Sequence, residues 1–319
     1  MPPGEVLAGI FSVTFAAGVL RVTTPILLPA LGGLISDLAG VINIALEGTM
    51  LLSAFTGVVV SAYTQSAWLG LAAALAAAAV FSLILAFVHL DLRADLILAG
   101  IAMNFLASGG TVFVMYSLTG DKGTSSELAS LTMPYVHVPI LRSIPVLGPI
   151  LSGQNLIVYL AFIMVALVWV FLFRTAPGTH LRAVGANPDA AATAGIDVRQ
   201  TRYTALVLSG LLAGLGGVHM SMGYLQLFQR DMTAGRGFIA LAAVFLGARH
   251  PVGTMVAALL FGTADALANQ LGTLRIPPQY VQVIPYVVTV AALAVNAIAQ
   301  QRAAVARQRR FQVRPATGE

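Results

Sequence analysis

Two carboxylates and three amides lie within otherwise apolar stretches of this sequence. Glu47 follows Asn43 by four residues in V-I-N-I-A-L-E-G-T-M, and Asp265 precedes Asn269 by four residues in D-A-L-A-N-Q. Residues four apart share one face of a helix, so each pair presents a carboxyl group and an amide together. Because a carboxylate at membrane depth is costly, it faces a protein interior or a water-filled path. We expect these two pairs either to line a solute path or to bond to a neighbouring helix end. For Asn104, a single polar side chain in its helix, we expect hydrogen bonding between helices, with the solute path as the alternative.

Residues that form metal or nucleophilic centres are missing or wrongly spaced for such chemistry. The chain has no cysteine, which removes disulfides and thiolate ligands. No two of its histidines lie three or four residues apart, the spacing that places two ligands on one helical face. Residues 120–124, G-D-K-G-T, lack the spacing of a phosphate loop, and no G-x-S-x-G elbow occurs. We therefore expect no cofactor or metal in this chain, and any ATP and Mg²⁺ on a partner.

The composition indicates a membrane protein. Hydrophobic residues make up 58% of the 319 positions and charged residues only 9%, against about 25% charged in soluble domains. The net charge of +5 does not indicate nucleic-acid binding, because five arginines cluster directly after the last apolar segment, where they fit a cytoplasmic patch facing anionic lipid. We predict one transmembrane domain over residues 1–300 and a basic cytoplasmic tail over 301–319.

The apolar segments predict an all-α bundle that crosses the membrane many times. A crossing needs about 20 apolar residues, so the chain holds about ten helices, of which roughly eight are full crossings. Segments 24–36 and 236–248 are too short to cross, so we expect broken helices there, covered by protein. The segments are 5–20, 24–36, 41–63, 68–90, 95–118, 154–173, 203–225, 236–248, 252–271 and 279–300.

The distribution of basic residues predicts the orientation. Cytoplasmic loops carry an excess of Lys and Arg, and one side of the predicted bundle holds the larger set: Arg93, Arg174, Arg182, Arg199, Arg202, Arg249 and the tail arginines. We therefore expect loop 174–202 and both termini in the cytoplasm. The Pro- and Gly-rich loop 119–153 then lies outside, either as a docking surface for a binding protein or as a plain connection.

A short surface helix is predicted within residues 181–198, between two membrane-length segments. Asn187 can accept hydrogen bonds from the free N–H groups, Pro188 fits the first helical position, and Asp189 favours the positive end of the helix dipole. Gly195 suits the left-handed residue that ends a helix. The small residues between them offer no apolar face large enough to anchor the helix alone, which favours a helix that docks in a groove of another protein.

The same stretch carries a family resemblance. Residues 182–196, R-A-V-G-A-N-P-D-A-A-A-T-A-G-I, resemble the cytoplasmic coupling loop of permeases from bacterial ABC importers for branched-chain amino acids, simple sugars and nucleosides. Residues 20–25 and 40–50 are similar to the nucleoside and simple-sugar permeases of that branch. The resemblance implies these residues for coupling to an ATPase: Arg182, Gly185, Asn187, Pro188, Asp189, Ala191, Ala192 and Gly195.

The resemblance also implies the fold, the partners and the location. It implies a type II ABC importer permease in the bacterial inner membrane, paired with a second permease subunit, a paralogue of this chain. Further partners are a cytoplasmic ATPase and an extracytoplasmic substrate-binding lipoprotein. The favoured solute is a nucleoside. The alternatives are a ribose-like sugar and, from a different class, a proton-coupled secondary transporter that uses Glu47 or Asp265 as a relay.

Overall fold

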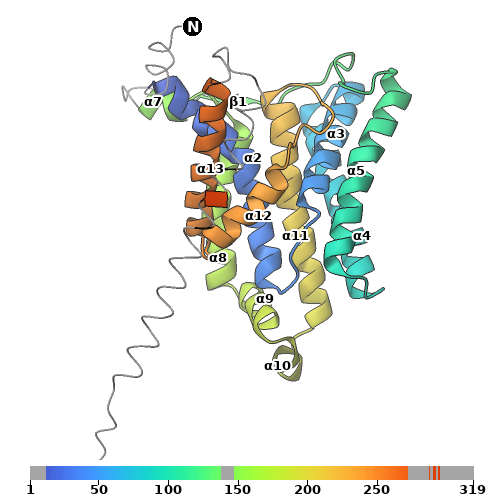
Figure 1. Ribbon diagram of the computed structural model, residues 1–319, viewed down its shortest axis with the longest axis vertical. Helices are drawn as coiled ribbons and strands as arrows, with labels where there is room; N and C mark the ends of the chain where they lie inside the picture. The colour runs from blue at the N-terminus through green and yellow to red at the C-terminus, as the bar shows by residue number, and fades with distance from the viewer. Residues whose placement is uncertain (1–11, 138–146, 272–286, 288–289, 292–293, 295–319) are drawn as a thin grey trace, which may run out of the picture.

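The computed structural model describes residues 12–137 and 147–271, together with 287, 290, 291 and 294. Long helices run side by side between two ends, one carrying α9 and α10 and the other carrying α7 and β1 (Figure 1). Within the described residues, seven helices are long and apolar enough to cross a membrane. They are Val13–Leu38 (α2), Leu46–Thr64 (α3), Ala67–Leu90 (α4), Leu96–Thr119 (α5), Leu156–Arg174 (α8), Val198–Tyr224 (α11 and η1) and Pro251–Leu271 (α13).

The break predicted between segments 5–20 and 24–36 is wrong, because the single helix α2 runs without interruption from Val13 to Leu38. Residues 5–11 of the first segment lie outside the described part of the chain. The Ser12 hydroxyl caps the start of α2 by accepting a hydrogen bond from the Phe15 N–H at 3.1 Å. Pro25 lies inside the helix and has no N–H for the carbonyl of Arg21 four residues earlier. His219 Nε2 donates to that carbonyl instead, at 3.1 Å. Tertiary packing therefore keeps α2 continuous through a position where the sequence predicted a break.

The centre of the bundle is formed by α2 and α11, which small residues bring together. A side chain on Gly32 of α2 would collide with the backbone of Ser209, and one on Gly210 would collide with Ser82 of α4. A side chain on Gly217 would collide with the backbone of Met50 in α3. Close helix approach of this kind is typical of membrane bundles. By contrast, α4, α5 and α8 each expose large apolar side chains on one face, as expected for helices that contact lipid.

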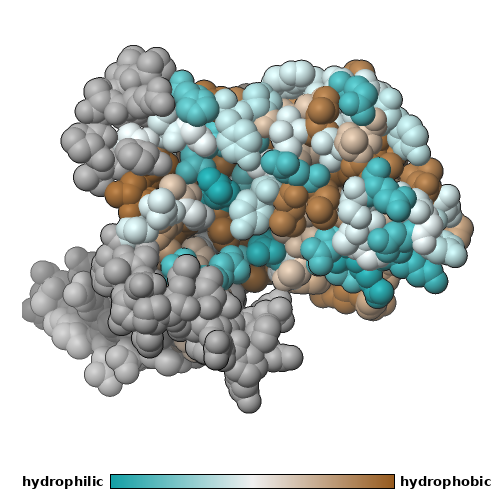
Figure 2. Space-filling view, turned by 90° about the horizontal axis from the view of Figure 1, so that it is seen from above, coloured by the Kyte–Doolittle hydropathy of each residue, from teal (hydrophilic) through white to brown (hydrophobic). Residues whose placement is uncertain are grey.

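The shorter elements lie at the two ends and within the bundle. At one end, strands Tyr135–Val136 (β1) and Gln154–Asn155 (β2) pair antiparallel beside helix Leu147–Leu151 (α7). Hydrophilic side chains spread over much of this end, as seen from above, with apolar side chains between them and at its margin (Figure 2). At the other end lie helices Ala176–Ala186 (α9) and Pro188–Thr193 (α10). The helix Arg236–Leu246 (α12) confirms the short helix predicted at 236–248.

The basic residues separate between the two ends as the sequence predicted. Among the described residues, the arginines of the larger set lie within α9 or close to the ends of α4, α8, α11 and α12 near α9 and α10. Lys122 and Arg230 lie at the β1 end. The predicted last segment, 279–300, and the tail lie largely or wholly outside the described residues, as do residues 1–11. The predicted location of the termini therefore stays a prediction. The described chain begins, at Ser12, at the β1 end, where Gln154 Nε2 donates to the Ala17 carbonyl at 3.2 Å.

Candidate functional site

The surface helix α10 has the caps that the sequence predicted. Asn187 Oδ1 accepts a hydrogen bond from the Ala190 N–H at 3.1 Å, and Pro188 is the first helical residue. Gly195 has φ +82°. Its N–H donates to the Ala192 carbonyl and that of Ile196 donates to the Ala191 carbonyl, both at 3.0 Å. These paired bonds past a left-handed glycine close the helix, so α10 is fixed by its own residues.

The residues expected to couple to an ATPase divide into an outward and an inward group. Asn187, Asp189, Ala192 and Gly195 are exposed at the tip of the molecule (Figure 1). Ala191 is only 4% exposed, so its methyl group is not available to a partner, contrary to the expectation from sequence. The other inward residues, Arg182 and Gly185, belong to α9, a helix that precedes α10 and was not predicted.

The inward group joins α9 to the membrane bundle. A Cβ at Gly185 would collide with the carbonyl of Leu38 at the end of α2, and the Cα of Gly185 lies beside Gly40. The Arg182 guanidinium lies over the Phe173 ring of α8, 4.9 Å from its centroid. These contacts leave no free space between Gly185 and residues 38–40. The turn that follows leads directly to Asn43 and Glu47.

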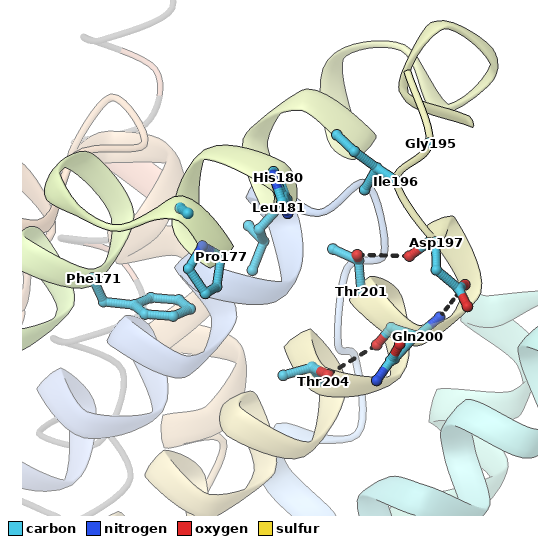
Figure 3. Close-up of a pocket in the computed structure, with 11 residues that line it drawn as sticks. Phe171, Pro177, His180, Leu181, Gly195, Ile196, Asp197, Gln200, Thr201 and Thr204 are labelled. Atoms are coloured by element: carbon cyan, nitrogen blue, oxygen red, sulfur yellow. Dashed lines mark hydrogen bonds between the residues drawn. The ribbon is translucent and has the colours of Figure 1, made fainter. Parts of the chain in front are cut away.

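An open groove of about 500 Å³ lies between α9, the turn after α10 and the first turns of α11 (Figure 3). Its walls include Pro177, Leu181 and Ile196. Asp197 Oδ1 accepts from the Gln200 N–H at 2.9 Å, and the Thr201 hydroxyl donates to the Asp197 carbonyl at 2.7 Å. Asp197 therefore caps α11 and leaves the groove with a mixed apolar and hydroxyl lining. Sequence reasoning missed this groove, because its walls come from three separate segments.

A charged cluster ties the start of α11 to the turn between α4 and α5. The Arg199 guanidinium and an Asp91 carboxylate oxygen are 2.7 Å apart, and the Tyr203 hydroxyl donates to the other oxygen. The hydrogen bond from Tyr203, and after it that from Arg199, lowers the pKa of the Asp91 carboxyl below its usual value. The sequence indicated only a solvated charge run around residue 91, because the two partners lie more than 100 positions later.

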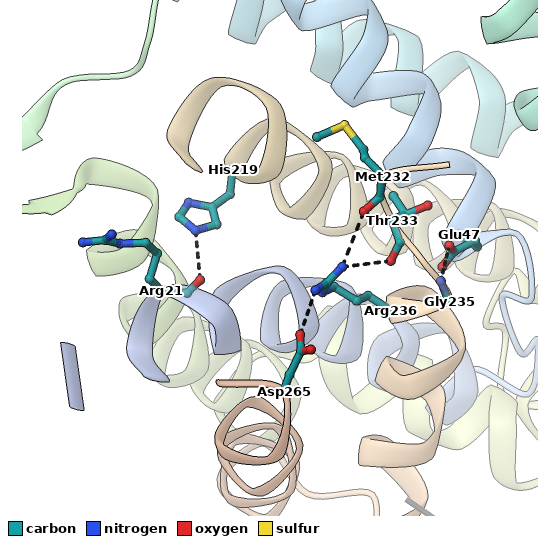
Figure 4. A network of polar contacts seen from close by, with 8 residues as sticks. All are labelled: Arg21, Glu47, His219, Met232, Thr233, Gly235, Arg236 and Asp265. Carbon is teal, nitrogen blue, oxygen red and sulfur yellow. Dashed lines mark hydrogen bonds and ion pairs between the residues drawn. The ribbon is translucent and has the colours of Figure 1, made fainter. Parts of the chain in front are cut away.

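Within the bundle, Glu47 bonds to the start of α12 (Figure 4). Its Oε1 accepts from the Gly235 N–H and its Oε2 from the Gly237 N–H, each at 2.7 Å. Residue 235 is a glycine, so α12 has no side-chain cap of its own. The carboxylate therefore replaces that cap at the positive end of the helix dipole. This geometry is the alternative stated for Glu47, a carboxylate bonded to a neighbouring helix end.

Asn43 and Asn104 hold the chain around the start of α3. Asn43 Nδ2 donates to the Ser209 hydroxyl at 3.0 Å, and its Oδ1 accepts from the Ala45 N–H at 3.0 Å. Asn104 Oδ1 accepts from the Gly48 N–H at 2.8 Å, and its Nδ2 donates to the Ile44 carbonyl at 2.9 Å. The favoured role of Asn104, hydrogen bonding between helices, is therefore confirmed. Asn43, Glu47 and Asn104 form one cluster, here called the α3 cluster.

Asp265 and Asn269 both lie on α13 but differ in their surroundings. An Asp265 oxygen is 2.7 Å from the Arg236 guanidinium of α12, and both side chains are largely buried. Arg236 extends from α12 between the α3 cluster and α13 (Figure 4). Asn269, by contrast, is exposed and makes no hydrogen bond within the described part of the chain. Sequence reasoning missed Arg236 as the partner of Asp265, because the two residues lie on different helices and 29 positions apart.

Across residues 12–137 and 147–271, no group of three or more His, Cys, Asp or Glu side chains could hold an ion. The carboxylates of the bundle are occupied by backbone N–H groups or by arginine. The contacts described above instead join the exposed helix α10, through α9 and the end of α2, to the α3 cluster within the bundle.

Comparison with known proteins assigns the chain to a protein family. Residues 15–293 match the family described as the permease component of branched-chain amino acid transport systems. The chain belongs to this permease family, and so it is a multi-pass membrane transport subunit. No solved structure matches it.

Its relatives are permease proteins of ABC transporters. The chain is 39% identical to the guanosine permease protein NupQ of Bacillus subtilis, over 84% of this chain and 87% of that one. It is 36% identical to the nucleoside permease protein NupC of Lactococcus lactis, over 87% and 90% of the two chains. It is also 34% identical to the putative glucose permease protein TsgC13 of Haloferax volcanii, over 88% and 92%.

Proposed function

We propose that this chain forms half of the translocation path of an ABC importer for nucleosides, and that ATP and Mg²⁺ bind to a separate ATPase. The observation that carries the proposal is the continuous connection from the exposed helix α10, through Gly185 on Leu38, to the α3 cluster. The names of the two most similar relatives described above support nucleosides as the solute. The remaining partners are a second permease subunit, a paralogue, and a substrate-binding lipoprotein at loop 119–153.

The coupling step follows from the rigidity of α9 and α10. The exposed residues Asn187, Asp189 and Ala192 enter a groove of the ATPase, and closure of the ATPase displaces both helices. Because Gly185 lies against the end of α2 without free space, the displacement reaches residues 38–45 and the α3 cluster. The bundle then tilts between outward-open and inward-open states, as alternating access requires.

The solute passes the polar residues of the bundle in this proposal. The α3 cluster and Asp265, held by helix ends and by Arg236, supply fixed polar groups along a largely apolar path, and Asn269 supplies a free amide. A proton relay is disfavoured, because both oxygens of Glu47 accept backbone N–H bonds and Asp265 is paired with an arginine. A sugar as solute is the second candidate, because the relative TsgC13 is named a putative glucose permease.

Uptake by the assembled complex tests the solute. Vesicles bearing both permease subunits, the ATPase and the lipoprotein are supplied with labelled guanosine, cytidine, ribose or glucose. We expect ATP-dependent accumulation of the nucleosides and none of the sugars. Accumulation of a sugar alone would replace nucleosides by the second candidate, and accumulation without ATP would exclude an ABC importer.

Enlarging Ala192 tests the coupling helix. Ala192 is exposed and α10 is closed by its own caps, so Ala192→Trp leaves the bundle folded and obstructs docking. We expect normal insertion but loss of stimulated ATP hydrolysis and of uptake. Ala72→Trp, the same change on the exposed face of α4, is the matched control and should retain both. Equal ATP hydrolysis in the two variants at matched expression would show that α10 is only a surface connection.

Cysteine labelling tests the orientation. The chain has no cysteine, so a single one at Ser126, in the exposed loop at the β1 end, gives an unambiguous readout. An impermeant thiol reagent should label it from outside the cell and label a cysteine at Ala192 only from the cytoplasm. The reverse pattern would invert the orientation and remove α10 from the reach of a cytoplasmic ATPase.

A further inference from the structure

Two adjoining hollows lie at the β1 end of the bundle, between α2, η1 and α13. The inner hollow has a volume of about 90 Å³ and the outer one of about 250 Å³. They share Val22, Tyr224 and Asn269 in their walls, so they form one recess that narrows from the end of the bundle inward. Together their volume lies at the lower end of the range of small-molecule pockets, roughly 300–1,000 Å³.

The inner wall of this recess is held in place by the irregular backbone of two helices. The segment His219–Tyr224 is a π-helix, a rare form that is frequent at functional sites. Pro25 leaves the Arg21 carbonyl without its helical partner, and His219 donates to that carbonyl at 3.1 Å (Figure 4). This bond fixes η1 against α2, so the recess is formed before any ligand arrives.

The polar groups of the recess are two guanidinium groups, amides, hydroxyls and the rings of a histidine and a tyrosine. Tyr224 is 47% exposed although it ends a membrane helix. Arg236 is neutralised by Asp265, but Arg21 has no acidic partner in the described part of the chain. Asn269 has no hydrogen-bond partner there either. An arginine and an amide without partners in a membrane bundle are costly unless they face water or a polar ligand.

These groups match a purine base better than a sugar. Aromatic side chains bind bases by stacking, which contributes about 1–3 kcal/mol per base. A guanidinium donates two parallel hydrogen bonds to the adjacent O6 and N7 acceptors of a 6-oxopurine, a pattern that adenine and the pyrimidines lack. An amide such as that of Asn269 both donates and accepts, so it suits the remaining base edge or a ribose hydroxyl.

We propose that this recess is a recognition site for the base of a 6-oxopurine nucleoside, with Tyr224 as the stacking platform, Arg21 as the donor pair and Asn269 as the adaptable amide. The inference rests on the proposed function and adds the solute class and the residues that select it. The apolar residues Val22 and Pro25 complete the wall of the recess.

Competition in the assembled complex tests the site. Uptake of labelled guanosine is measured with unlabelled guanosine, cytidine or ribose as competitor, in wild type and in Tyr224→Leu, Tyr224→Phe and Arg21→Gln. We expect the KM for guanosine to rise about tenfold in Tyr224→Leu and to stay near wild type in Tyr224→Phe, because the ring is kept. Arg21→Gln should lower the preference for guanosine over cytidine about tenfold.

Two control variants lie outside the recess. Phe113→Leu removes an aromatic ring that is 70% exposed on α5, and Arg230→Gln removes an exposed arginine at the same end of the molecule. Both should keep the KM and the preference of the wild type. The amount of assembled complex in the membrane, measured for every variant, separates loss of recognition from loss of assembly.

The possible failures are distinguishable. If wild type accumulates no nucleoside, the proposed function fails and this site fails with it. If wild type accumulates guanosine but Tyr224→Leu and Arg21→Gln retain its KM and its preference over cytidine, the proposed function stands and the recess is not the recognition site. Equal inhibition by ribose and guanosine in wild type would show that the recess recognises the sugar and not the base.

Discussion

The two short helices α10 and α12 differ in how their first N–H groups are satisfied. At α10 the acceptor is Asn187, three residues before its donor. At α12 the acceptor is Glu47, which lies 188 residues from Gly235 along the chain. The first helix is thus fixed by its own sequence and the second by another helix. A locally capped helix moves as a unit with its loop, whereas a remotely capped helix moves with α3.

The N-termini of the two helices also differ in their exposure to water, which changes the free-energy cost of losing each cap. Water can satisfy the free N–H groups of α10 if its cap is lost, because the helix is exposed. Around Gly237 the chain is buried, so no such replacement exists for α12. An unsatisfied group costs far more in the second setting. The remote cap therefore stabilises the fold, and the local cap adjusts a surface element.

Loss of the remote cap should have the largest effect. Glu47→Leu leaves the N–H groups of Gly235 and Gly237 without acceptors, so we expect a loss of about 3 kcal/mol of stability. The measurement is the thermal unfolding midpoint of the purified subunit in detergent. The midpoint of Glu47→Gln, which keeps one acceptor oxygen, should lie between those of Glu47→Leu and wild type. Glu127→Leu, in the exposed outer loop, is the matched control, and an equal midpoint for the two Leu variants would contradict the capping role.

A change at the end of α10 should have a smaller and local effect. A Cβ at Gly195 would meet no atom within 4 Å, so the cost of Gly195→Val comes only from its left-handed backbone, about 1–2 kcal/mol. Amide hydrogen exchange across residues 190–196 should accelerate roughly tenfold while the bundle stays protected. Gly195→Asn tolerates the left-handed backbone and should exchange almost as slowly as wild type. Equal acceleration in both variants would show that the backbone conformation is not the cause.

Removal of the local cap should be milder still. Asn187→Ala deletes the acceptor of the Ala190 N–H and costs about 1 kcal/mol of helix stability. We expect roughly fivefold faster exchange of that amide, with the thermal midpoint of the bundle unchanged. Asn187→Ser restores an acceptor and should restore protection. A fall in the global midpoint comparable to that of Glu47→Leu would remove the distinction between the two helices.

Loss of the charged cluster around Asp91 should have the smallest effect on stability. Its partners Arg199 and Tyr203 are remote in the chain, as at α12, but the cluster is exposed to water. The pKa of Asp91 is lowered in the fold, so its contribution to stability is present above the unfolded pKa of about 3.9 and is lost as pH falls through the folded value. The unfolding midpoint of Asp91→Asn should lie slightly and uniformly below that of wild type from about pH 6 to 8, with the difference shrinking below about pH 4. A difference that grows on acidification would contradict this sign.

Features that depend on neighbouring residues could be predicted from the sequence. The apolar segments gave the membrane class, and the order Asn, Pro, Asp and Gly gave α10 with its caps. The short helix α12 followed from the length of its apolar run. The break expected in α2 failed, because Pro25 is a local feature whose effect is offset by His219, a residue on another helix.

By itself, then, the sequence determined the composition, the spans between residues 41 and 271 and the locally capped helix, because periodicity and caps act within a few residues. Only the tertiary structure decided which groups satisfy Glu47 and Asp265, that Gly185 and Ala191 point inward, and that Arg21, Tyr224 and Asn269 share one recess. These relations join helices far apart in the chain. They follow from the packing of the bundle, where each buried polar group must find whichever partner the neighbouring helices present.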